Sequence, residues 1–120
     1  MIWDPSRIER KSWADVHAFY AALEDRNHDF APLRVLAAHV RAQPYSSSLA
    51  VAVSGTSLLV APKGHSDWPR EAVRVDLDFG GVVRFDRPGA SSKSGTLVHD
   101  DAKVIAHFER VLQELRWLPG

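Results

Sequence analysis

Apolar residues recur every three or four positions in three parts of the chain, which is the spacing of one face of an α-helix. The first stripe runs from Trp13 to Leu23, and the second runs from Leu33 to Val40. The third and longest stripe consists of Val104, Ile105, Phe108, Val111, Leu112, Leu115 and Leu118. The pattern therefore predicts three amphipathic helices, two near the start of the chain and one at its end.

Polar residues and prolines predict the ends of these helices. The first helix has two start signals, Asp4-Pro5 and a capping-box pattern that begins at Ser12. We expect the second helix to start near Pro32 and to stop at Pro44, because the residue before a proline avoids helical geometry. Asp100 is placed to cap the third helix, since an aspartate side chain accepts hydrogen bonds from free N–H groups of a first turn.

Residues 46–62 contain no charged side chain and alternate in a way that predicts a β-hairpin. A two-residue turn at Ser54-Gly55 would close this hairpin. The expected pairs are Val53 with Thr56, Val51 with Leu58 and Leu49 with Val60. In this register one face is apolar, and the other is small or weakly polar.

A second hairpin is predicted between residues 72 and 87. A three-residue loop at 79–81, with Gly81 in the left-handed conformation, keeps the apolar side chains on one face. The expected pairs are Leu77 with Val83, Val75 with Phe85, Asp76 with Arg84 and Arg74 with Asp86. The last two pairs set opposite charges across from each other on the outer face, which stabilises an antiparallel ladder.

The order of these elements predicts an α+β fold in a single domain that covers residues 1–120. We expect a four-stranded antiparallel sheet of two hairpins with helices packed on one face, in the order α-α-β-β-β-β-α. The C-terminal helix should lie across the leucine and valine face of both hairpins. Residues 88–95, rich in serine and glycine, are expected to form a loop.

Composition narrows the functional classes. Fifteen Lys and Arg residues balance fifteen Asp and Glu residues, so the basic excess typical of nucleic-acid or membrane-surface binding is missing. The chain has no cysteine, which excludes disulfides and thiolate sites. No apolar run is long enough for a membrane span, and the N-terminus does not resemble a signal peptide. We therefore expect a cytoplasmic protein with no nucleic-acid or membrane partner.

The sequence lacks the common motifs of catalytic sites. The stretch GASSKSG at 89–95 lacks the glycine that precedes the lysine of a phosphate-binding loop. The adjacent residues His65, Ser66 and Asp67 do not form a triad, because triad partners must converge in space. No spacing suggests a zinc site, and no cofactor motif is present. We therefore expect no catalytic residue, no metal and no cofactor.

The histidines keep one enzymatic alternative open. His99, Lys103 and His107 are four residues apart and would share one face at the start of the last helix. Two histidines beside a cation are the groups that a ribonuclease-like site needs. A small hydrolase or nuclease is accordingly the third functional hypothesis, against the simpler interpretation of a solvated polar helix face.

The outer face of the predicted sheet is the main candidate for binding. One half carries small or apolar side chains, namely Ala50, Ala52, Ser57 and Leu59, here called the small-residue patch. The patch is a packing face covered by the N-terminal segment with Ile2, Trp3 and Ile8, the interface of a homodimer, or a surface that a foreign partner covers. The first two alternatives are favoured. The other half carries charges of both signs. The predicted partner-binding residues are Asp67, Trp68, Arg74, Asp76, Asp78, Arg84 and Asp86.

In general build the chain resembles small bacterial toxin-immunity proteins, of the contact-dependent inhibition or polymorphic-toxin type. These are cytoplasmic domains of this size with helices on an antiparallel sheet. The resemblance implies a non-enzymatic protein that covers the active site of a toxin domain, such as a nuclease. Asp76, Asp78 and Asp86 would then mimic phosphate, and Trp68 would be the apolar anchor, as tryptophan is enriched among binding hot spots. A dimeric ligand-binding or accessory domain is the second hypothesis.

Overall fold

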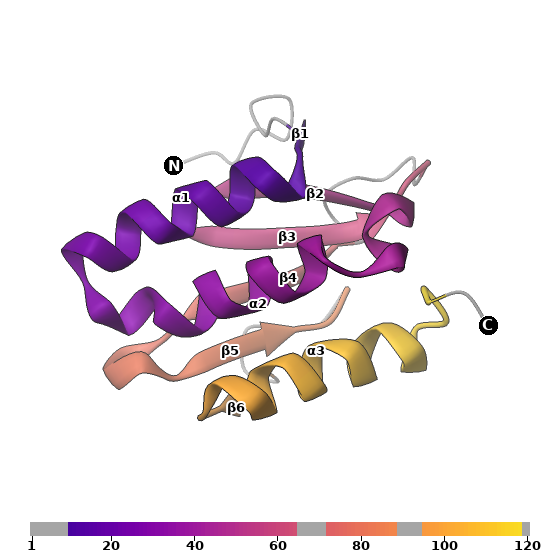
Figure 1. Ribbon diagram of the computed structural model, residues 1–120. Helices are drawn as coiled ribbons and strands as arrows, with labels where there is room; N and C mark the ends of the chain where they lie inside the picture. The colour runs from indigo at the N-terminus through magenta and orange to yellow at the C-terminus, as the bar shows by residue number, and fades with distance from the viewer. Residues whose placement is uncertain (1–9, 65–71, 89–94, 119–120) are drawn as a thin grey trace, which may run out of the picture.

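The computed structural model describes residues 10–64, 72–88 and 95–118, and within them the chain folds as α+β. Three α-helices lie on one face of an antiparallel sheet (Figure 1). They are α1 (Trp13–Arg26), α2 (Ala31–Arg41) and α3 (Asp101–Glu114). The helix α2 lies between the other two and contacts both. The predicted α+β class, with helices on one face of an antiparallel sheet, is confirmed. The expectation that the C-terminal helix lies across both hairpins was wrong, because α3 lies beside α2 and over the side of the sheet formed by β5 (Val83–Asp86) and β6 (Thr96–Val98) (Figure 1).

The sheet is larger than predicted. In the described part of the chain it has six strands in the order β1-β2-β3-β4-β5-β6, all antiparallel. The strands are β1 (Arg10–Lys11), β2 (Leu49–Ser54), β3 (Ser57–Pro62), β4 (Val73–Leu77), β5 (Val83–Asp86) and β6 (Thr96–Val98). The prediction of four strands, and of a chain that starts with a helix, was therefore wrong. Strands of two and three residues are too short to show an alternating pattern.

The first helix begins at the second of its two predicted start signals. The Ser12 hydroxyl accepts a hydrogen bond from the Asp15 N–H group at 3.0 Å, so Ser12 is the N-cap of α1. The segment Arg10–Lys11 is extended and pairs with β2, and is not the helix that the earlier signal predicted. Asp4-Pro5 lies outside the described residues.

The last helix is capped as predicted but ends earlier than its apolar stripe. The Asp100 carboxylate accepts from the Ala102 N–H group at 3.0 Å. At the other end the Trp117 N–H group bonds to the Leu112 carbonyl, and Arg116 has φ of +61°. This is the six-to-one bond and left-handed residue of a Schellman motif. The motif turns Trp117 away from the helix axis.

Two short 3₁₀ segments flank α2, one before it and one after it. The segment η2 (His28–Phe30) joins α1 to α2, and η3 (Pro44–Ser48) leads from α2 into β2. Proline at the start of η3 ends the preceding helix, as the sequence predicted.

The register of the second hairpin matches the prediction at every pair. Arg74 lies opposite Asp86 and Asp76 lies opposite Arg84, and the loop η4 is Phe79–Gly81. Both loop glycines have positive φ, whereas the sequence required this only of Gly81. The charge pairs and the apolar pairs require the same register, so the sequence was sufficient to predict it.

The register of the first hairpin differs from the prediction by two residues. The turn is Gly55-Thr56, and Val51 pairs with Val60 instead of Leu58. Gly55 has φ of +61° at the first central position, where type II′ turns favour glycine. Because side chains alternate with a period of two, this shift leaves the assignment of the two faces unchanged.

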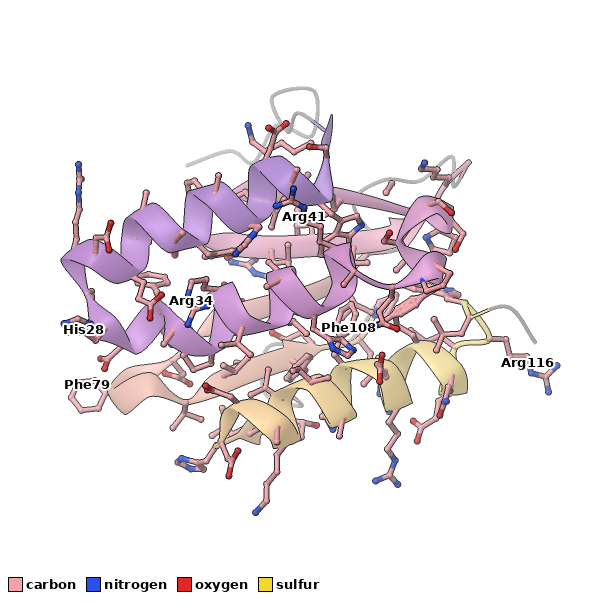
Figure 2. All side chains as sticks on the ribbon, in the orientation of Figure 1. His28, Arg34, Arg41, Phe79, Phe108 and Arg116 are labelled. Atoms are coloured by element: carbon pink, nitrogen blue, oxygen red, sulfur yellow. The ribbon has the colours of Figure 1, made fainter. Side chains whose placement is uncertain are left out.

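The core lies between the helices and the inner face of the sheet. Its large side chains include Tyr20 of α1 and Leu36 of α2, both fully buried. Phe108 of α3 is also fully buried there (Figure 2). The Tyr20 hydroxyl donates to the Thr56 carbonyl at 2.9 Å and so fastens α1 to the β2–β3 turn. With the inner face fully used for packing, the outer face is the surface on which a site can form.

Candidate functional site

The small-residue patch is buried within the single chain. The relative exposures of Ala50, Ala52, Ser57 and Leu59 are 5, 0, 5 and 5 %. A second copy could not contact these side chains without a rearrangement of the chain that covers them. The observation favours the packing alternative over the dimer interface.

Part of the cover comes from a residue that the sequence did not single out. Trp117, which follows α3, packs against an apolar cluster of Leu59, Ala61 and Ala72 on the outer face. The Schellman motif at the end of α3 directs the chain to this position. The predicted cover by the N-terminal segment falls on residues 1–9, outside the described ranges.

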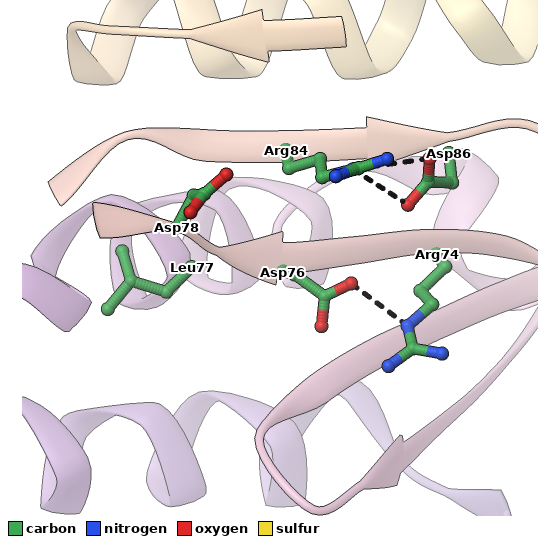
Figure 3. Close-up of a pocket in the computed structure, with 6 residues that line it drawn as sticks. All are labelled: Arg74, Asp76, Leu77, Asp78, Arg84 and Asp86. Atoms are coloured by element: carbon green, nitrogen blue, oxygen red, sulfur yellow. Dashed lines mark hydrogen bonds and ion pairs between the residues drawn. The ribbon is translucent and has the colours of Figure 1, made fainter. Parts of the chain in front are cut away.

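The other half of the outer face carries an alternating pattern of charges. On β4 the Arg74 Nε donates to Asp76 Oδ2 at 2.9 Å, and on β5 the Arg84 Nε lies 3.3 Å from Asp86 Oδ2 (Figure 3). Across the two strands each arginine faces the aspartate of the other pair. Every one of the four charges therefore has an opposite charge along its strand and another across it.

Neighbouring strands hold this pattern in place. The Ser57 hydroxyl on β3 hydrogen-bonds to Asp76 and accepts from Arg74 Nη2 at 3.1 Å. On the other side, Gly95 precedes β6 and approaches the ion pair of β5 so closely that a Cβ atom there would overlap the guanidinium. The charged side chains are thus ordered before any partner arrives, which lowers the entropy cost of binding.

These residues surround one shallow depression of about 370 Å³. It is lined by Arg74, Asp76, Leu77, Asp78, Arg84 and Asp86 (Figure 3). We call this surface the charged face. The structure therefore brings together five of the seven predicted partner-binding residues. The remaining two, Asp67 and Trp68, lie outside the described residues.

Two exposed apolar residues lie next to the charged face, and sequence reasoning missed both. Phe79 at the tip of the β4–β5 hairpin is 96 % exposed and points away from the molecule (Figure 2). Leu97 on β6 is 56 % exposed and pairs with Arg84. They are the large apolar side chains most exposed in the described part of the chain. Asp78 accepts from the Phe79 N–H group at 2.7 Å and so helps to fix the base of the aromatic residue.

The histidines of the enzymatic hypothesis do not form a pair. His107 and Lys103 line a depression of about 270 Å³ on α3, whereas His99 precedes the helix and does not line it. The His107 ring packs edge-on against Phe85, with ring centroids 4.7 Å apart. Partial burial, aided by the charges of Arg87 and Arg110, lowers the pKa of His107 although Glu114 opposes this effect. This environment suits a packed neutral imidazole rather than an acid–base pair.

The lowered pKa of His107 predicts a pH dependence of stability. An unfolded histidine takes up a proton near pH 6.5, while the folded chain resists protonation until a lower pH. The unfolded state therefore binds more protons, and the free energy of unfolding falls as the pH drops below that value. We expect His107→Gln to flatten this decline between pH 7.5 and the folded pKa in urea titrations. An equally steep decline in the variant would contradict the assignment.

A second polar cluster joins the helices to each other. Glu109 Oε2 of α3 accepts from the Tyr45 hydroxyl at 2.7 Å and lies 2.9 Å from His39 Nε2. Burial alone would raise the pKa of Glu109, but hydrogen bonds from Tyr45 and His39 hold it below its ordinary value. Burial, followed by the bond to Glu109, raises the pKa of Tyr45. The cluster fastens α3 to α2 and η3.

Among the described residues, no three histidine or acidic side chains are grouped as a metal would require. None of the helices in the described ranges is long and apolar enough to cross a membrane. No protein-family model, curated protein or solved structure matches the chain. The functional assignment accordingly depends on the geometry of the outer face.

Proposed function

We propose that the chain is a non-enzymatic protein-binding module that docks a cognate protein through the charged face and Phe79. The observation that carries the proposal is the almost complete exposure of Phe79, at 96 %, beside a pre-ordered set of charges. Leaving a phenylalanine in water forgoes roughly 1.5–3 kcal/mol of burial energy, which a partner could recover. Aromatic anchors surrounded by polar groups are typical of binding hot spots.

The four paired charges align the partner on the charged face and contribute little to the affinity. Exposed ion pairs contribute about 0–1 kcal/mol, so Arg74–Asp76 is not a source of much stability. An alternating pattern nevertheless accepts only a surface with the complementary pattern, because a displaced partner would bring like charges together. The pattern thus selects the partner, and the apolar residues Phe79 and Leu97 supply the binding energy.

The kind of partner proposed is a bacterial toxin domain, in keeping with the resemblance to immunity proteins. Phosphate mimicry by all three aspartates needs revision, since Asp76 and Asp86 are held by arginines and their side chains are 25 and 17 % exposed. Asp78 is exposed and has no ion pair among the described residues. It is the carboxylate best placed to enter a cationic site next to the aromatic anchor.

A site-specific crosslink in the native cells tests this proposal. A photo-reactive phenylalanine analogue is placed at position 79 or at position 97, and in a control at Ala22, an exposed position of α1. We expect one and the same protein to be crosslinked from positions 79 and 97 but not from Ala22. Crosslinks of equal yield from all three positions would contradict docking at the charged face.

The toxin assignment has its own test. The captured partner is expressed in bacteria with and without the chain, and growth is measured. Neutralisation predicts that the partner stops growth alone and that the chain restores it, whereas a Phe79→Asp variant does not. If the captured partner is harmless when expressed alone, the immunity function is wrong. The proposal that the chain is a binding module would still stand.

A further inference from the structure

A third depression lies at the β1 edge of the sheet, where β1 leads into α1. It has a volume of about 400 Å³, within the range of small-molecule sites. The polar residues that line it are Lys11, Ser12, Ser46, Ser47 and Lys63, and its apolar floor is Trp13, Leu49, Ala50 and Val51. We call it the edge pocket. It is separate from the charged face, and the proposed function does not use it.

The described residues that line the edge pocket give it a positive charge. Lys11 and Lys63 have no ion pair among the described residues, and none of the described residues that line the pocket is acidic. The Lys63 N–H group bonds to the Ser48 carbonyl at 3.0 Å, which holds this lysine next to the serines of η3. The chain as a whole has equal numbers of acidic and basic residues. Two lysines that line one pocket therefore create a local positive electrostatic potential, which attracts an anion.

Hydroxyl groups and a helix end add to this potential. The pocket includes the first residues of α1, a helix of 14 residues whose dipole places partial positive charge at this end. The Ser47 hydroxyl donates to the Pro44 carbonyl, so its lone pairs remain, and the Ser12 oxygen accepts from Asp15, so its proton remains. Both hydroxyls therefore retain hydrogen-bonding capacity toward a ligand.

Trp13, which lines the pocket, carries a buried donor that lacks an acceptor. Trp13 is 7 % exposed, and its indole Nε1 has no hydrogen-bond partner. It is the only buried side-chain polar atom without a partner in the described part of the chain. Such an unpaired donor costs about 1–3 kcal/mol, so native structures usually satisfy it. A ligand in the pocket would lie against Trp13, so the indole N–H resonance reports on binding.

We propose that the edge pocket binds a small phosphate monoester. Two ammonium groups match the double charge of a phosphate, and lysine is a common phosphate ligand as a point charge. The hydroxyls of Ser12 and Ser47 can bond to its oxygens, while Leu49 and Ala50 offer contact to an organic group. A carboxylate would bring a single charge to the same two lysines and is expected to bind more weakly.

The test is an NMR titration of the ¹⁵N-labelled full chain with phenyl phosphate at constant ionic strength. We expect the indole N–H resonance of Trp13, assigned by its loss in Trp13→Phe, to move and to saturate. Benzoate, with the same ring and one charge, should bind about tenfold more weakly. An unmoved Trp13 resonance, or equal affinity for benzoate, would overturn the proposal.

Substitution of the lysines supplies the control. Lys11→Ala combined with Lys63→Ala should raise the dissociation constant of phenyl phosphate at least about tenfold. Both lysines are exposed, so the variant should fold, as its remaining amide resonances would show. Lys103→Ala on α3 removes an exposed lysine elsewhere and should leave the constant unchanged. If Lys103→Ala weakened binding as much as the double lysine variant, the attraction would be nonspecific. That result would overturn the proposed phosphate site.

Discussion

Ala52→Asp is expected to lower the free energy of unfolding by about 3–5 kcal/mol, because it places a carboxylate at a fully buried position. Ala52 is 0 % exposed on β2 and pairs with Leu59, whose side chain is also buried. A chain of this size is stabilised by only about 5–15 kcal/mol, so the variant should lose much of its stability.

The measurement is urea unfolding followed by circular dichroism, together with the mass of the native protein by light scattering. Ala22→Asp is the matched control, since Ala22 is exposed on α1 and the change there should cost about 0.7 kcal/mol of helix propensity. If the patch were a dimer interface, Ala52→Asp would instead give a folded monomer from a dimeric parent. That outcome would contradict the packing interpretation.

The sequence predicted the fold where several independent signals agreed. In the second hairpin the apolar pairs and the charge pairs allowed one register, which the structure has at all four pairs. In the first hairpin, small and apolar residues on both faces left the turn position open, and glycine preference decided it at Gly55. The edge strands β1 and β6 could not be predicted, because their pairing depends on tertiary neighbours and not on a local pattern.

The candidate site was predictable to a similar degree. Strand alternation and the hairpin register placed Arg74, Asp76, Arg84 and Asp86 on one face with opposite charges across the strands. The structure adds the ion pairs that form along each strand. The exposure of Phe79 was not predictable, since a phenylalanine in a tight loop folds back onto the core as readily as it points outward. Trp117 was missed for a related reason, because its position depends on the cap that ends α3.

Phe79→Ala is expected to weaken binding of the cognate protein by about 2 kcal/mol or more, roughly 30-fold in affinity. The side chain is 96 % exposed in the free chain, so its removal should leave the free energy of unfolding nearly unchanged. A loss of affinity without a loss of stability would identify the residue as a binding anchor. The measurement is calorimetric titration with the partner that is crosslinked from position 79.

Asp78→Asn separates the role of charge from that of the anchor. The amide oxygen can still accept from the Phe79 N–H group, so the loop should keep its shape while the negative charge is lost. If Asp78 faces a cation of the partner, the variant should associate more slowly and with less dependence on salt. Asp25→Asn on α1 makes the same chemical change at an exposed position away from the hairpin and should alter neither property. Unchanged binding by both Phe79→Ala and Asp78→Asn would show that the partner docks elsewhere, and would remove the basis for assigning function to the charged face.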